Sequence, residues 1–157
     1  MPFIKDIIAR EILDSRGNPT IITKLYLDNG FFGTGQVPSG LFPNKNEFGE
    51  IRDNDSSRYN GNGVKKAVEI INNKIKKALI GISVNELTDI DYTMIELDGT
   101  ENMSNLGRNS IFSVSLAATR AIAESQNLPL YKYLAQTMKL PTNTITMPIP
   151  LINMING

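Results

Sequence analysis

The 157-residue sequence has no cysteine and no histidine. Their absence excludes disulfides, thiol nucleophiles, serine–histidine catalysis and the usual zinc sites. Sixteen basic and sixteen acidic residues cancel, so the chain has no net field to attract nucleic acid or an anionic membrane. No apolar run approaches the roughly 18 residues of a membrane span, and the charged N-terminus lacks the core of a signal peptide. We therefore expect a soluble, cytoplasmic protein without nucleic-acid or membrane partners.

Three extended segments open the chain. The first, FIKDIIAREI at 3–12, is rich in isoleucine and ends before the turn residues Asp-Ser-Arg-Gly-Asn-Pro. The second, TIITKLYL at 20–27, has β-branched and aromatic residues. Asp-Asn-Gly at 28–30 is typical of a tight hairpin and leads into FFGTGQV at 31–37. Three strands with short turns predict an antiparallel meander, whose apolar face needs a covering layer.

Helical periodicity follows and supplies that layer. Apolar residues recur at helical spacing over 64–79, with lysines largely on the other side and Gly81 as a stop. A second helix is expected to start near Asn85. Small and apolar residues fill most faces of 109–125, which predicts a buried central helix that lets its neighbours approach closely. A last helix is expected to begin at Pro129.

The run MPIPLINMING at 147–157 is typical of a buried strand. A lone apolar strand would leave its edges and faces uncovered. We therefore expect that it either returns to the sheet or is the first strand of a further structure. The predicted fold class is α+β: a three-stranded antiparallel meander, then a helical layer, then an isolated strand. The predicted division is an α+β domain over 1–140 and a linker with one strand over 141–157.

Nine short motifs resemble the start of enolase (phosphopyruvate hydratase), in the order found there: REILDSRGNPT, VPSG, IRDND, SRY, ALIG, MIELDGTEN, SLAATRA, LPLYKYL and PIPLINMING. The resemblance runs the length of the chain. It implies an N-terminal α+β capping domain, followed in the full-length family by a large α/β barrel. It also implies the glycolytic dehydration of 2-phosphoglycerate to phosphoenolpyruvate. There a lysine removes the proton beside the carboxylate and two Mg²⁺ ions hold the ene-diolate.

The catalytic groups of the family lie in the barrel. The base lysine, the acid glutamate, the main metal carboxylates and the substrate-binding histidine all come after the part that this chain resembles. The resemblance thus implies no catalytic residue in these 157 residues and no tightly bound Mg²⁺. It implies binding of 2-phosphoglycerate or phosphoenolpyruvate only if a barrel is present, in the same chain or in trans.

The resemblance also implies a mobile lid loop, usually VPSGASTGxxEAxELRD. Here Ser39 and Gly40 match its stem, but Phe42 stands where the family has the serine that ligates the second Mg²⁺. A phenyl ring offers no oxygen to a hard cation. The neighbouring replacements are Leu41 for Ala, Pro43 for Thr and Asn44 for Gly. We interpret the loop as a lid remnant without its metal role; the alternative is a working lid with shifted ligands, such as Ser39.

Other matches concern assembly and turns. Arg10 matches a family position that pairs across a homodimer, and Ile22 replaces its acidic counterpart. Arg16 and Asn18 are expected to hold the first turn. Asp53 and Asp55 can bind a cation, although a solvated turn is the simpler interpretation.

Two interpretations of the whole chain stay open. The first is the N-terminal part of an enolase, predicted inactive alone because it lacks the barrel. The second is a degenerate, non-catalytic enolase-like paralogue that acts as a binding or interaction module. Phe42, Ile22 and Arg108, which stands where the family has a small residue, favour the second.

Overall fold

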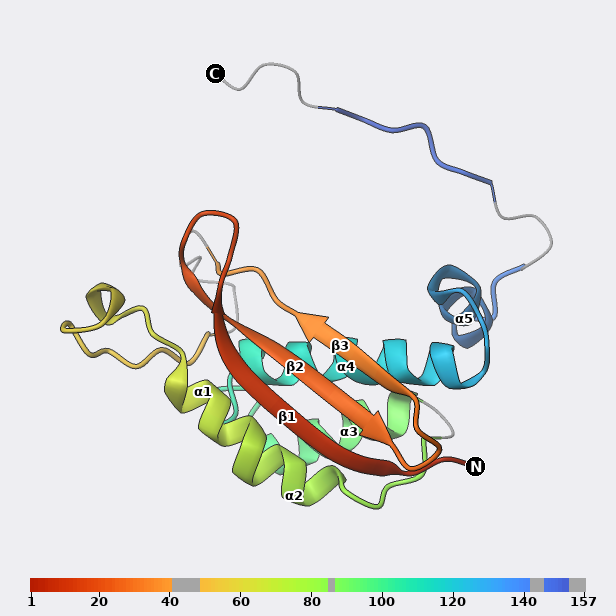
Figure 1. Ribbon diagram of the computed structural model, residues 1–157, viewed down its shortest axis with the longest axis horizontal. Helices are drawn as coiled ribbons and strands as arrows, with labels where there is room; N and C mark the ends of the chain where they lie inside the picture. The colour runs from red at the N-terminus through yellow and green to blue at the C-terminus, as the bar shows by residue number, and fades with distance from the viewer. Residues whose placement is uncertain (41–48, 85–86, 142–145, 153–157) are drawn as a thin grey trace.

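The computed structural model describes residues 1–40, 49–84, 87–141 and 146–152. Over these ranges, helices cover one face of a three-stranded sheet (Figure 1). The predicted α+β class, a meander followed by a helical layer, is confirmed. In this part of the chain, no helix has the length and apolar character needed to cross a membrane.

The sheet is antiparallel with the order β1-β2-β3. Its strands are β1 (Ile4–Leu13), β2 (Pro19–Leu27) and β3 (Phe32–Gln36). The turn between β1 and β2 is organised by Asp14, whose carboxylate accepts hydrogen bonds from the backbone N–H of Asn18 at 2.8 Å and of Arg16 at 2.9 Å. These bonds, with that from Asn18 the strongest cause, lower the pKa of Asp14. The expected turn residues therefore act through their backbones.

The helix expected over 64–79 is present but is not uniform. It consists of α1 (Lys65–Glu69), a π-helical segment η2 (Ile70–Ile75) and α2 (Lys76–Leu79), and it runs beside β1 (Figure 1). Asn72 in η2 accepts a hydrogen bond from Ala9 N–H at 2.8 Å and donates one to Ala9 C=O at 3.1 Å. β1 is an edge strand, so the N–H and C=O of Ala9 have no strand to pair with on that side. The side-chain amide of Asn72 supplies the missing partner for both groups. The π-helical turn is where the side chain makes that contact.

The central helix α4 (Arg108–Ser125) packs on the inner face of the sheet against β2 and β3 (Figure 1). A Cβ atom added to Gly35 would lie 2.0 Å from the backbone oxygen of Ser113, and one added to Gly33 would lie 2.1 Å from that of Ala117. The strand and helix backbones therefore touch without intervening side chains. This confirms the expectation that small residues in α4 allow close approach.

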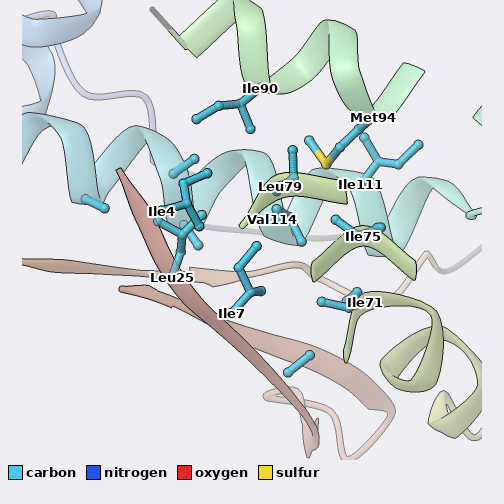
Figure 2. Packing of buried hydrophobic residues seen from close by; sticks show 14 of the residues in the cluster. Ile4, Ile7, Leu25, Ile71, Ile75, Leu79, Ile90, Met94, Ile111 and Val114 are labelled. Carbon is cyan, nitrogen blue, oxygen red and sulfur yellow. The ribbon is translucent and has the colours of Figure 1, made fainter. Parts of the chain in front are cut away.

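The core lies between the sheet and the helices. Isoleucines and leucines from β1 and β2 face apolar side chains from η2, α2, α4 and α3 (Leu87–Asp98), as Figure 2 shows. The labelled members are Ile4, Ile7, Leu25, Ile71, Ile75, Leu79, Ile90, Met94, Ile111 and Val114, and all are buried. Burial of each such side chain contributes about 1.5–3 kcal/mol relative to exposure.

Two further elements complete the described part of the fold. η1 (Tyr59–Gly61) is a short 3-10 turn before α1, and α5 (Leu130–Thr137) packs against α4. Residues 146–152 form no strand and do not join the three-stranded sheet. The exposed fractions of Met147, Ile149 and Leu151 are 88%, 89% and 98%. The buried terminal strand expected from the sequence is thus not formed over 146–152, because a strand needs an edge to pair with and a layer to cover it. The domain division at residue 140 stays a prediction.

Candidate functional site: the stem of the lid loop

The lid stem, defined as residues 37–40 together with 49–53, leaves the sheet at the end of β3. Val37 is 5% exposed, and its carbonyl oxygen accepts a hydrogen bond from the hydroxyl of Thr20. Its N–H donates to the carbonyl of Ile21 at 3.4 Å. The stem therefore starts from a fixed point on β2 before it reaches Ser39 and Gly40.

Arg52 connects the stem to two other segments. Its Nη1 donates to the carbonyl oxygens of Pro19 and Asn62, both at 2.8 Å. Its Nη2 donates to Ser39 Oγ at 2.7 Å and forms an ion pair with Glu50. The rigid fork of a guanidinium suits four fixed acceptors, which a lysine cannot satisfy in the same way. Ser39 is thus an acceptor in a structural network.

Glu50 completes the network from the returning side of the stem. Its Oε1 accepts the Gly40 N–H at 3.1 Å and lies 3.6 Å from Nη2 of Arg108. The Glu50 side chain is 13% exposed, so its charge needs the compensation that Arg52 and Arg108 supply. Gly40 is therefore held by its backbone, and Arg108 contacts the stem from the start of α4.

Asp53 acts at the start of α1. Its carboxylate accepts the backbone N–H groups of Lys66 at 2.9 Å and Lys65 at 3.1 Å, and lies 3.3 Å from Nη1 of Arg58. Helix N-termini favour such a negative acceptor. Its side chain is 8% exposed, so the expectation of a solvated turn is wrong at this position. The sequence did not reveal this role because the cap comes from twelve residues away.

The carboxylates of Asp55 and Glu11 also accept backbone hydrogen bonds, Asp55 within its own turn and Glu11 across to the start of α1. Asp55 accepts hydrogen bonds from the hydroxyl and the N–H of Ser57, and these bonds lower the pKa of Asp55. Glu11 accepts the N–H of Val64 at 2.7 Å and pairs with Arg58. Glu11 joins β1 to the start of α1, and nothing in the sequence pattern marked it.

A magnesium ion requires several oxygen ligands. Within the described ranges, no group of three or more Asp, Glu, His or Cys side chains can hold a metal ion. Glu50 and Asp53 are already bound to arginines and backbone N–H groups. These two carboxylates are therefore occupied in bracing the stem and the start of α1. The position of Phe42, with Leu41, Pro43, Asn44 and Glu47, lies outside the described residues.

Arg10 lies on the outer face of the sheet, in register with Ile22 of β2 and, across β2, with Gln36 of β3. It is exposed. Within the described residues it forms no ion pair. A shallow hollow of about 320 Å³ surrounds it, lined by Ile8, Arg10, Ile12, Ile22, Lys24 and Tyr26. Arg10 and Ile22 are thus neighbours within one chain; a homodimer contact through Arg10 stays a prediction.

Asp98, the aspartate of the motif MIELDGTEN, accepts hydrogen bonds from the segment that follows α3. Its Oδ2 accepts the Leu106 N–H at 2.6 Å, and its Oδ1 accepts the N–H and the hydroxyl of Thr100. The carboxyl is buried, which alone would raise its pKa, but these hydrogen bonds outweigh burial and lower the pKa of Asp98. The residue fixes the connection from α3 to α4.

A pocket of about 480 Å³ lies at the foot of the stem, between the end of β3, α3 and α4. Its apolar lining is Val37, Pro38, Ile95, Met103, Ile111 and Phe112, and its polar lining is Glu50, Asp91, Arg108, Asn109 and Ser115. Burial raises the pKa of Asp91 despite a hydrogen bond with Ser115. Sequence reasoning missed this pocket because its walls come from separate segments of the chain: the stem, α3, Met103 and α4.

Comparison with protein-family models gives one finding. The model described as "Enolase, N-terminal domain" matches residues 4–134. The matched range begins with β1, includes the lid stem and ends within α5.

Proposed function

The chain belongs to the enolase N-terminal domain family, and we propose that it is the capping domain of an enolase-like protein. The full-length reaction would be the dehydration of 2-phosphoglycerate to phosphoenolpyruvate. The observation that carries this proposal is the family match together with the braced lid stem inside it. A capping domain has to hold its lid at a fixed point beside a second domain.

In this role, the residues of the stem position the lid and perform no proton transfer. Ser39 Oγ accepts a hydrogen bond from Arg52, and the Gly40 N–H donates one to Glu50. Both contacts are charge-assisted hydrogen bonds, which are the stronger class. We assign no metal-dependent step to this chain, since Glu50 and Asp53 are engaged by arginines and backbone N–H groups. The base and the acid belong to the barrel that the family implies.

The second candidate function is a non-catalytic binding module. Its support is Phe42 in place of a ligating serine and Arg108, which reaches from α4 to Glu50 and ties the stem to the helix.

The gene sequence after the Gly157 codon separates the two candidates. An in-frame continuation into a barrel with a lysine base and acidic metal ligands supports the capping-domain proposal. A stop codon, with no separate barrel chain that copurifies, supports the binding module.

A direct assay complements the gene sequence. The purified 157-residue chain, supplied with Mg²⁺ and 2-phosphoglycerate, is expected to form no phosphoenolpyruvate. Turnover by this chain would contradict the proposal that the catalytic groups lie elsewhere. We further propose a cytoplasmic location, supported by the glycolytic role of the family; fractionation of cells with an antibody to the chain tests it.

A further inference from the structure

Asp91 on α3 is a half-buried acid whose carboxyl group lacks full compensation. Its Oδ1 is buried and has no hydrogen-bond partner among the described residues. A buried carboxylate oxygen normally finds a donor, and leaving one without costs about 1–3 kcal/mol or more. The hydrogen bond with Ser115 does not offset burial, so the pKa of Asp91 stays raised. One oxygen of this carboxyl group therefore lacks a hydrogen-bond donor.

The pocket beside Asp91 can receive a small molecule. Its volume of about 480 Å³ falls inside the roughly 300–1,000 Å³ of ligand sites, and a mostly apolar wall with a few polar groups is typical of them. The side chains of Ile95 and Phe112 are 40% and 48% exposed. Their exposed surface is available to an apolar group that enters the pocket.

The charged groups around the pocket determine which sign of charge a bound molecule should carry. Glu50 has Arg52 and Arg108 as cationic neighbours. Asp91 has no ion-pair partner within the described residues. Asn109 is engaged with both backbone groups of Ile51, at 3.1 Å each. The carboxyl of Asp91 is thus the polar group of the lining that still needs a donor.

We propose that this pocket binds a small organic cation, a primary or secondary amine with a compact apolar group. The ammonium lies against Asp91, and the apolar group lies between Ile95 and Phe112. This binding goes beyond the capping role and does not depend on it. An ammonium in a partly desolvated site gains a charge-assisted hydrogen bond that a neutral isostere lacks.

Three probes that share a phenylethyl group and differ in the charge of the end group test the proposal: 2-phenylethylamine, 2-phenylethanol and 3-phenylpropionate, titrated into the full chain. Backbone amide chemical shifts, recorded by NMR, report where each probe binds. We expect shifts at Ile95, Phe112 and Ser115, and binding of the amine about tenfold tighter than that of the alcohol, since one charged hydrogen bond is worth about that factor.

Two variants locate the charge preference. Asp91→Asn keeps the shape and removes the charge, and it is expected to abolish the preference for the amine. Asp89→Asn, on the same helix but outside the pocket lining, is expected to leave that preference unchanged. Equal binding of all three probes, tightest binding of the propionate, or shifts confined to another surface would each overturn the proposal. So would a preference that survives Asp91→Asn.

Discussion

β3 and the lid stem that follows it contact the rest of the molecule in two different ways. Within the strand, Gly33 and Gly35 lie against the backbone of α4 with no side chain between them. Beyond the strand, Ser39 and Gly40 are held by the side chains of Arg52 and Glu50. The first contact depends on shape alone, and the second depends on charged hydrogen bonds between the two segments of the stem.

The difference separates folding from positioning. Protein interiors are packed like crystals, so one added methyl group between β3 and α4 has nowhere to go. The stem network is partly exposed, and its loss leaves the core in place. We therefore expect substitutions in the strand to change global stability and substitutions in the stem to change mainly the local order of the stem.

The largest effect is expected for Gly35→Ala. Its Cβ would lie 2.0 Å from the Ser113 oxygen, so either α4 or β3 must shift. We expect the free energy of unfolding, measured by urea denaturation, to fall by about 3 kcal/mol or more. The control is Gly49→Ala, because a Cβ at Gly49 meets no atom within 4 Å. Equal stability of the two variants would contradict the claim that β3 and α4 pack too closely to admit a side chain at Gly35.

The next effect is expected for Arg52→Ala in the stem. The change removes the donor of four contacts and leaves Glu50, which is 13% exposed, with one cation fewer. We expect a loss of about 2–3 kcal/mol and fast amide hydrogen exchange at Ser39 and Gly40. Arg52→Lys is expected to recover only part of the protection. Slow exchange in both variants would show that the stem does not need this network.

A smaller effect is expected at Asp98, which is neither in the strand nor in the stem. Hydrogen bonds lower its pKa in the folded state. Its stabilisation is therefore present above the ordinary pKa of about 4 and is lost as the pH falls through the folded value. Asp98→Asn should lower stability at pH 7 by about 1–2 kcal/mol and flatten the acid limb of the stability curve. An unchanged acid limb would show that Asp98 does not carry this dependence.

The smallest effect is expected for Ser39→Ala. Arg52 would lose one acceptor of four and keep the other three. We expect a change of about 0.5–1 kcal/mol and faster exchange only around Gly40. A loss as large as that of Arg52→Ala would mean that the serine, rather than the arginine, organises the stem.

Much of the fold could be predicted from local patterns. The isoleucine-rich and β-branched segments with their turn residues predicted the meander, and the small residues of α4 predicted the close packing. The π-helical segment could not be predicted, because the apolar pattern over 64–79 fits an unbroken helix equally well. What distinguishes it is the contact of Asn72 with Ala9, sixty-three residues away.

The candidate site could be predicted only in outline. The motif VPSG identified one segment of the stem, but the hydrogen bonds of Arg52 reach Pro19 at the start of β2 and Asn62 before α1. The capping role of Asp53 and the pocket at Asp91 likewise need the tertiary fold. Sequence patterns report periodicity and turns, whereas these contacts join segments whose spacing carries no local signal.

The most direct test of the capping-domain proposal is the activity of a chimera. Residues 1–140 replace the N-terminal domain of an active enolase, once with the present loop and once with Leu41→Ala, Phe42→Ser, Pro43→Thr and Asn44→Gly. We expect the substituted chimera to dehydrate 2-phosphoglycerate at least about 100-fold faster than the other, as for loss of one electrostatic catalytic group. Equal activity would contradict the inferred loss of the lid's metal role, and two inactive, folded chimeras would contradict the capping role itself.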